Sequence, residues 1–469
     1  MNIKIKCAKK RTFLSAEAIF GKTHGNMNGM TKLAIMMMSA AVLSAGCAGH
    51  GLTIRITDAG AVQDTCTDNA SIINSAIDRC SRNGGGTVII PEGRFMSSTI
   101  YMKPDVTLML DEGAELAASS RLASYGHLTA DADLSRYDTG KGSANSNCAS
   151  DTTWTKALIL AEKADRASIT GTGRINGRHI VNPAGEEGMR GPHAILIAES
   201  TGVTVSGITI DKASNYAILC YDIEGCRFSG ITVTQGWDGI HIRGGKDIAI
   251  DSCSFSTGDD CIAGGWWKDM SINGCRLNSS CNGIRMIMPS EDVDIANCSF
   301  TGPGIYPHRT SSDKGGRMLH GIIMEPGAWG GDASGELSGI RLRNIRAENL
   351  LAPFCMTLLD GQHCSDITVE NFDASGTYGM ALSVKSWKSA TIDSVRIANS
   401  SFSFIGNPEP GLEKKILSMP EDRWPFFPSY GAYFRNVGKV TLDNVVFSTE
   451  GTDSRQAVMT RNAGSIDER

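Results

Sequence analysis

The chain has 469 residues and a net charge of −5, and 41% of its residues are hydrophobic. This length allows one large domain or two to three smaller ones, with enough apolar content for an extensive core. The acidic balance gives no electrostatic reason to expect nucleic acid or an anionic membrane as a partner.

The N-terminal segment has the pattern of a bacterial export signal. Residues 30–47, MTKLAIMMMSAAVLSAGC, combine a lysine, an apolar stretch too short to span a bilayer and small residues before Cys47. Residues 1–29 are interpreted as an extension from an upstream start codon. The residues before Cys47 resemble a lipoprotein signal, so plain cleavage and lipid anchoring through Cys47 both stay open. We expect an exported protein, periplasmic or on the bacterial cell surface.

Residues 67–83, TDNASIINSAIDRCSRN, predict an amphipathic helix that covers the N-terminal end of the fold. Asp68 is the expected N-cap. One helical face carries Ile72, Ile73, Ala76, Ile77 and Cys80. The next residues, 84–95, predict a first strand. Residues 120–155, rich in Ser, Asp, Asn and Gly, are expected to form a surface loop, and 418–436 break the alternating pattern.

A short strand pattern repeats through the rest of the chain. DIAIDSCSF, DMSINGCRL and DVDIANCSF begin at residues 247, 269 and 292 and align without gaps. A repeat of this length, too short for a propeller blade, predicts a parallel β-helix. Like side chains are then expected to stack inside, because paired strands lie about 4.8 Å apart. One such column, Cys253, Cys275 and Cys298, is interpreted as a core ladder of thiols rather than a disulfide or metal site.

Three polar stretches fall on successive coils: GWDGIHIRG (236–244), TGDDCIAGG (257–265) and SSCNGIRMI (279–287). Asp238 and Asp259 are 21 residues apart, and Asp259 and Cys281 are 22 apart, so each step is taken as one coil.

The alternation of strand residues predicts which side chains of these coils face outward. Ile240 and Ile242 point inward, so the residues expected to point out are His241, Arg243, Arg285 and Glu325. A turn or bulge at Gly258 would bring the adjacent Asp259 and Asp260 out beside Asp238. Three carboxylates in an exposed groove repel one another, which raises at least one pKa as a general acid requires.

An Asp-Gly on one coil with Gly-Asp-Asp on the next resembles glycoside hydrolase family 28, the polygalacturonases and their relatives. The resemblance covers roughly residues 55–450 and implies an all-β, right-handed parallel β-helix over 50–460 with an N-terminal capping helix. It implies inverting hydrolysis of α-glycosidic bonds in pectic or related plant polysaccharides, with no cofactor and no metal. By this resemblance Asp259 is the general acid, and Asp238 and Asp260 activate water.

The chain also departs from the family pattern. It has Gln235-Gly236-Trp237 before Asp238, where the family has Asn-Thr, and Ser280-Cys281-Asn282 in place of Gly-His-Gly. Ile323-Met324-Glu325 replaces Arg-Ile-Lys, so Glu325 would repel an acidic sugar. Residues expected to contact the substrate are Arg285, His241, Arg243, Cys281, Asn282, Trp266 and Glu325.

Two other functions stay open at this point. A β-helix polysaccharide lyase would use clustered acids to hold Ca²⁺ and an Arg or Lys as base. A carbohydrate-binding solenoid without catalysis would also fit the missing histidine. The sequence does not distinguish endo from exo cleavage, and it leaves the sugar and the oligomeric state undetermined.

Overall fold

The computed structural model describes residues 51–129, 134–138, 147–311, 315–328, 330 and 333–469. The expected extension and export signal, residues 1–47, lie outside the described residues. No helix within the described part is long and apolar enough to cross a membrane.

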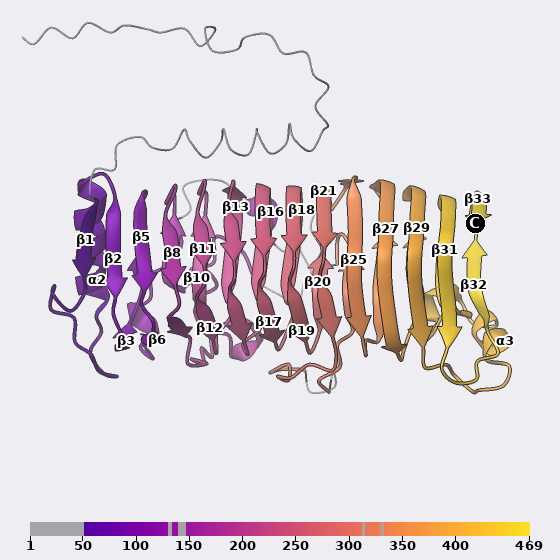
Figure 1. Cartoon of the computed structure of the whole chain (residues 1–469), viewed down its shortest axis with the longest axis horizontal. Coiled ribbons are helices and arrows are strands. Elements are labelled where there is room, and N and C mark those ends of the chain that lie inside the picture. Colours follow the sequence, from indigo (N-terminus) through magenta and orange to yellow (C-terminus); the bar gives the residue numbers. More distant parts are fainter. Residues whose placement is uncertain (1–50, 130–133, 139–146, 312–314, 329, 331–332) are drawn as a thin grey trace, which may run out of the picture. The chain divides into compact units, whose positions relative to one another are not determined.

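The described chain winds into three parallel sheets, whose strands stack one coil after another from β1 to β33 (Figure 1). The first, here the site sheet, contains β4 (Ile100–Tyr101), β7 (Ala157–Glu162), β10 (His193–Ala198), β13 (Ile218–Glu224), the starts of β16 (Ile240–Asp251) and β18 (Ile262–Asn273), β20 (Asn282–Met286), β23 (His320–Met324), β26 (Ala352–Leu358), β28 (Leu382–Ser386), β30 (Ser429–Arg435) and β32 (Gln456–Arg461).

The second sheet contains β1 (Leu52–Arg55), β2 (Gly86–Ile90), β5 (Val106–Leu110), β8 (Ser168–Gly171), β11 (Thr204–Ser206), β14 (Arg227–Ser229), the ends of β16 and β18, β21 (Glu291–Ala296), β24 (Gly335–Leu337), β25 (Ile340–Glu348), β27 (Gln362–Thr377), β29 (Thr391–Phe404), β31 (Val437–Thr449) and β33 (Ser465–Glu468). The third contains β3 (Gly93–Ser97), β6 (Ala114–Ala118), β9 (Arg174–Asn176), β12 (Thr209–Asp211), β15 (Thr232–Thr234), β17 (Ser254–Thr257), β19 (Arg276–Ser279) and β22 (Ser299–Thr301), and it continues in the ends of β25, β27, β29 and β31. The last strand therefore ends beyond residue 460, the expected limit of the domain.

The predicted interior columns are confirmed by the strand register. Ile248 pairs with Met270 and Met270 with Val293, and Phe255, Leu277 and Phe300 align in the same way. The Cys253, Cys275 and Cys298 side chains are buried, unpaired thiols. The repeat therefore predicted the core correctly, because each coil places the same kind of side chain above the last.

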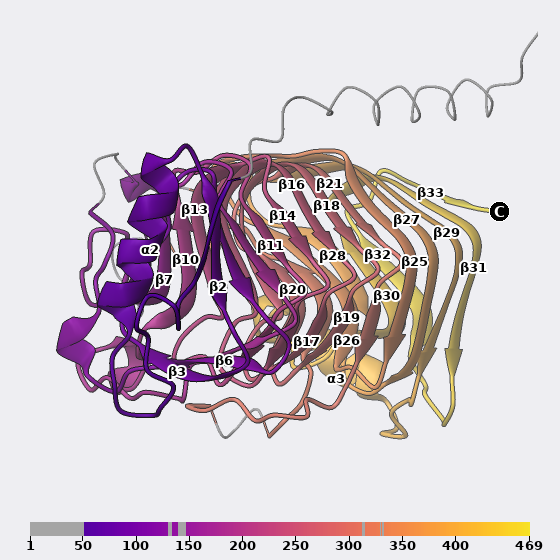
Figure 2. The ribbon, with the colours of Figure 1, turned by 60° about the vertical axis from the view of Figure 1, so that its left-hand side comes forward.

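Helix α2 (Ala70–Arg82) lies across the end of the coil stack formed by β1 and β2 (Figure 2). Its buried residues are Ala70, Ile73, Ala76, Ile77 and Cys80. The N-cap is Asn69 rather than the expected Asp68, whose carboxylate instead accepts hydrogen bonds from the N–H groups of Ala70 and Ser98. Asp68 therefore ties the start of the helix to the first coil. The C-terminal part of the stack also carries a short helix, α3 (Leu412–Leu417).

The described residues between 120 and 155, which are 120–129, 134–138 and 147–155, include several that pack on the site sheet, so the expectation of a surface loop is wrong for these. Leu128, Leu134, Tyr137 and Trp154 are buried. They pack on outward-facing side chains of the site sheet in a second apolar cluster outside the coil interior. The composition of this segment is mostly polar, but its few large apolar side chains pack on the sheet and fix the segment there.

Candidate active site

The aspartates lie at the starts of adjacent strands of the site sheet. Ile240 pairs with Ile262, which places Asp238 level with Asp260, and the Gly239 N–H donates to the Asp260 carbonyl at 2.9 Å. The 21-residue spacing had predicted that Asp238 would be level with Asp259. That prediction is wrong by one residue, because this coil has 22 residues.

A turn at Gly258 separates β17 from β18 and carries Asp259, as predicted. The hydroxyls of Thr257 and Ser279 both donate to the Asp259 carbonyl, at 2.7 and 2.6 Å, which fixes the backbone of the turn. A side chain at Gly258 would be obstructed, because its Cβ would lie 2.6 Å from the Gly236 carbonyl oxygen. The turn therefore holds Asp259 and Asp260 with little freedom.

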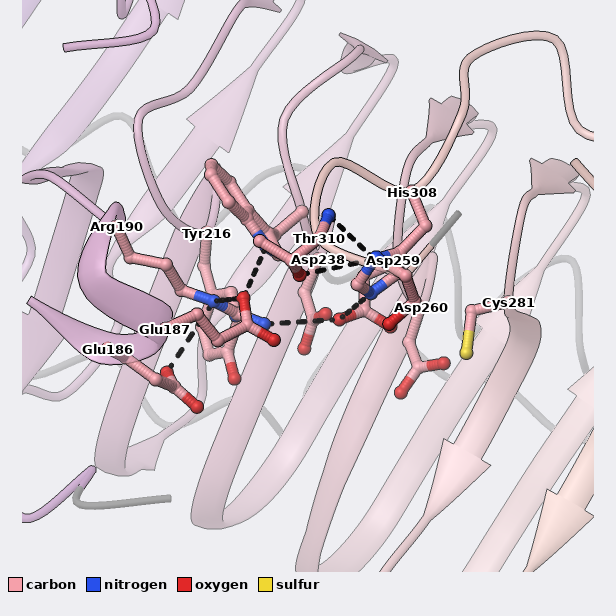
Figure 3. A network of polar contacts seen from close by, with 12 residues as sticks. Glu186, Glu187, Arg190, Tyr216, Asp238, Asp259, Asp260, Cys281, His308 and Thr310 are labelled. Atoms are coloured by element: carbon pink, nitrogen blue, oxygen red, sulfur yellow. Dashed lines mark hydrogen bonds and ion pairs between the residues drawn. The ribbon is translucent and has the colours of Figure 1, made fainter. Parts of the chain in front are cut away.

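The carboxylates do not share an open groove. Asp238 and Asp260 are buried, whereas the Asp259 side chain is 14% exposed. Figure 3 shows the segments that cover them, one carrying Glu186, Glu187 and Arg190 and the other carrying His308. Asp259 is therefore the member of the cluster that a molecule from solvent reaches first.

Arg190 is the main cation of the cover. Its Nε lies 2.9 Å from Glu187 Oε2, and its Nη2 lies 3.5 Å from Asp259 Oδ2. The guanidinium carbon is 5.0 Å from the centre of the Trp237 ring. Burial raises the pKa of the neighbouring Glu186. The cover thus brings one cation and two further acidic groups to the aspartates.

His308 binds the same oxygen of Asp259. Its Nε2 lies 3.2 Å from Asp259 Oδ2, and its Nδ1 accepts the N–H groups of Thr310 and Ser311 at 3.3 and 3.0 Å. Because Nδ1 is an acceptor, the imidazole proton is on Nε2 and is donated to Asp259. Two donors therefore anchor this oxygen of Asp259.

Asp238 is the carboxyl group with the clearest protonation shift. Burial raises its pKa well above the usual range, and the charges of Asp259 and Asp260 add to the shift. His241 lies against it, with Nδ1 2.6 Å from Asp238 Oδ2. Burial lowers the pKa of His241 well below its usual range, so the imidazole is neutral. Asp238 therefore keeps a proton at pH values where an isolated aspartate is ionised.

Asp260 is held as an acceptor. Its Oδ1 accepts the Asn282 N–H at 3.2 Å and the Asn282 side-chain amide at 2.7 Å, and its Oδ2 is 3.6 Å from Arg285 Nη1. Arg285 also contacts Glu325, with its Nε and Nη2 2.7 and 2.6 Å from the same carboxylate oxygen. Glu325 thus neutralises the arginine that was expected to grip an acidic sugar.

His241 and Arg243 point out of the coil as predicted, but neither faces an open groove. Both are buried: the Tyr216 ring stacks on His241 at 4.8 Å, and the guanidinium of Arg243 lies 5.5 Å from the centre of the Trp154 ring. The Arg243 Nη1 donates to the main-chain carbonyls of Tyr137 and Asn147, at 3.2 and 2.7 Å. His241 belongs to the aspartate cluster, whereas Arg243 is bound to the cover.

Cys281 is buried beside the cluster, and its Sγ is 3.3 Å from the Asn282 side-chain amide nitrogen. Asp259, Asp260 and Cys281 each place one ligand atom within 4.8 Å of the others, so this group is the place where the described residues could hold a cation.

Trp266 is half-buried, with its ring against Arg136 at 4.9 Å. The adjacent Trp267 is buried in the core and donates to the Ile242 carbonyl at 2.9 Å. At most one of the two tryptophans is therefore able to stack on a sugar.

Three functional candidates were not found from the sequence: Arg190, His308 and His320. His320 starts β23, and its Nδ1 is 2.8 Å from the Asn282 side-chain oxygen. His320 has the parity of the inward-facing Ile322 and Met324, so the alternation that identified the outward residues does not find it. The available signal was its place two residues before Ile322, which matches the place of Asn282 before Ile284. Arg190 and His308 lie in irregular segments without such a pattern.

These features define a parallel β-helix with a partly covered carboxylate site at the strand starts of one sheet. A family model described as a right-handed β-helix region matches residues 193–323. The segment that carries the aspartates therefore also matches this fold by sequence.

Curated relatives and solved structures match parts of the chain that range from a fifth to most of its length. A polygalacturonase of Juniperus ashei is 33% identical over 96 residues, which is 19% of this chain and only 18% of that protein. An exopolygalacturonase of Arabidopsis thaliana is 21% identical over 401 residues, covering 79% of this chain and 83% of the relative. The family 28 exopolygalacturonase of Yersinia enterocolitica superposes with a TM-score of 0.62 at 15% identity, over 89% of this chain and 78% of its own. The predicted resemblance is confirmed, and the chain is polygalacturonase-like.

Proposed function

We propose that the protein is a glycoside hydrolase that cleaves α-glycosidic bonds in pectic or related plant polysaccharides. The observation that carries the proposal is the cluster of Asp238, Asp259 and Asp260, in which one carboxyl keeps its proton and another is held as an acceptor. Glycoside hydrolysis needs this pair of states, an acid for the leaving oxygen and a base for water.

Asp259 is assigned as the general acid because it is the most exposed of the three carboxyl groups. His308 and Arg190 donate to one of its oxygens, which fixes the side chain. As general acid, Asp259 must carry a proton when the leaving oxygen departs. The adjacent Asp238, whose pKa is raised by burial, is the group from which that proton is proposed to come.

Asp260 is assigned to water activation, because the adjacent Asp238 keeps its proton and in that state does not act as a base. The two Asn282 donors and the nearby Arg285 stabilise its carboxylate. Ligand oxygens of Asp259 and Asp260 approach within 4.8 Å, closer than the roughly 6.5–9.5 Å between the carboxyls of inverting enzymes. Inversion is therefore proposed from the family resemblance and not from this separation.

The pectic substrate is supported by the relatives, which are named polygalacturonases or exopolygalacturonases. Arg285 is the site's candidate contact to a sugar carboxylate, with its charge offset by Glu325. We also propose that the protein acts after export, since the signal-like residues 30–47 precede the fold and plant polysaccharides lie outside the bacterial cell.

The test is a paired assay of reducing ends and ultraviolet absorbance on a panel of pectic fragments. We expect the wild type to release reducing ends without absorbance, because hydrolysis leaves no unsaturated end. Asp259→Asn should lower kcat by a factor of about 10² to 10⁴, the usual contribution of a general acid. Asp422→Asn, at an exposed aspartate outside the site, is the matched control and should behave as wild type.

Other results would point to the alternatives. Products that absorb ultraviolet light would identify a lyase. Glycan binding without turnover on any fragment would identify a binding solenoid. Full activity of Asp259→Asn would contradict the assignment of the acid.

A further inference from the structure

The row of carboxylates at the strand starts is followed on the next two coils by two polar residues, Asn282 and His320. The register places Asp238, Asp260, Asn282 and His320 one above the other. The Asn282 amide nitrogen is 2.7 Å from Asp260 Oδ1, and the Asn282 amide oxygen is 2.8 Å from His320 Nδ1. A chain of two hydrogen bonds therefore connects a half-buried histidine to a proposed catalytic carboxylate.

The direction of these bonds follows from the chemistry of the three groups. A carboxylate only accepts, so the Asn282 NH₂ group must face Asp260 and its carbonyl must face the histidine. His320 Nδ1 must then carry a hydrogen and donate it. Burial lowers the pKa of His320 to about 4, so above that pH the ring is neutral and holds one proton. The Asn282 carbonyl selects the Nδ1 tautomer.

Asn282 is the partner of Asp260 Oδ1 that the described contacts show. Both short bonds to this oxygen come from Asn282, one from the backbone and one from the side chain. Arg285 is 3.6 Å from the other oxygen, and it also binds Glu325. The Asn282 amide orients Asp260 only while its nitrogen points at Oδ1. That nitrogen also lies 3.3 Å from Cys281 Sγ, and His320 holds the oxygen at the far end of the amide.

We propose that His320 is a positioning residue, which fixes the Asn282 amide and through it the Asp260 carboxylate that activates water. This inference rests on the proposed hydrolase function.

The test compares His320→Ala with His320→Asn. Asparagine carries its side-chain nitrogen at about the position of histidine Nδ1, so it still donates to the Asn282 carbonyl, whereas alanine does not. We expect His320→Ala to lower kcat by about 10- to 100-fold with KM little changed, since small misplacements of a reacting group cost this much. His320→Asn should recover most of the loss. His363→Ala, at a histidine of β27 outside the site, is the matched control.

A double-mutant cycle tests whether the effect passes through Asn282. If it does, Asn282→Ala combined with His320→Ala should be no slower than Asn282→Ala alone. Fully additive losses, or equal kcat values for wild type and His320→Ala, would overturn the inference while leaving the hydrolase intact.

Crystal structures of the wild type and His320→Ala give a readout that does not need turnover. We expect the Asn282 amide and the Asp260 carboxylate to rotate in the variant. An unmoved Asp260 carboxylate would refute the positioning role, even if no substrate is found. Lack of wild-type turnover on any glycan would instead refute the proposed function.

Discussion

Replacing Asp238 by asparagine should stabilise the protein, and the gain should grow as the pH rises. The Asp238 carboxyl is buried beside Asp259 and Asp260, and these conditions raise its pKa well above the usual range. In the unfolded chain the same carboxyl titrates near its ordinary pKa of about 3.9. Between the two pKa values the native state holds a proton that the unfolded state has lost. Wild-type stability therefore falls as the pH rises through this interval.

The size of the pH effect on the free energy of unfolding is set by the one proton that Asp238 binds in the native state and loses on unfolding. Each pH unit in the interval changes the free energy of unfolding by about 1.4 kcal/mol. From pH 5 to pH 7 the advantage of Asp238→Asn should therefore grow by up to about 2.7 kcal/mol, as long as native Asp238 stays protonated. An unfolding entropy of about 2.1 cal/mol/K per residue over roughly 400 residues converts this gain into about 3 °C.

The assay is thermal unfolding of wild type and Asp238→Asn at pH 5, 6 and 7 and constant ionic strength. Asp422→Asn serves as the control, because Asp422 is exposed. The difference in melting temperature between this variant and wild type should be the same at each pH. If the difference between Asp238→Asn and wild type is constant across the series, native Asp238 has no raised pKa. Asp238 would then not supply the proton that the proposed mechanism requires.

Two further changes probe the core and the substrate site. Phe300→Ala removes a buried ring from the column above Leu277 and should cost about 3–5 kcal/mol in thermal unfolding; a loss no larger than that of Ile305→Ala, at a 67% exposed side chain, would contradict the stacked core. Glu325→Gln removes the charge that offsets Arg285. It should lower KM for galacturonate oligosaccharides about fivefold, because two charges 4 Å apart in water interact by roughly 1 kcal/mol. KM for a neutral glycan should not change. An equal change in KM on both substrates would show that Arg285 does not contact a carboxylate.

The sequence predicted the coil stack because its information is periodic. A side chain at Ile250 must lie over Ile272 once the strands pair, whatever happens elsewhere in the chain. The adjacent Asp259 and Asp260 were also predicted to lie in a turn, and β17 and β18 do end and begin around them. The error in the register of Asp238 has the same origin. The pairing is set by the inward-facing isoleucines, and Ile240 and Ile262 are 22 residues apart, whereas Asp238 and Asp259 are 21 apart.

The cover could not be predicted in this way, because insertions between strands have no period. Asn282 and His320 are 38 residues apart yet pair on adjacent coils, since the residues between them include the segment that carries His308. Counting by coils of 22 or 23 residues therefore misses His320 altogether. Arg190 is held over Asp259 by the neighbouring Glu187 and by Trp237, and only the folded chain brings Trp237 and Asp259 to it. The repeat thus determines which side chains each coil offers, whereas the insertions determine how far those side chains are exposed and which protonation state they adopt.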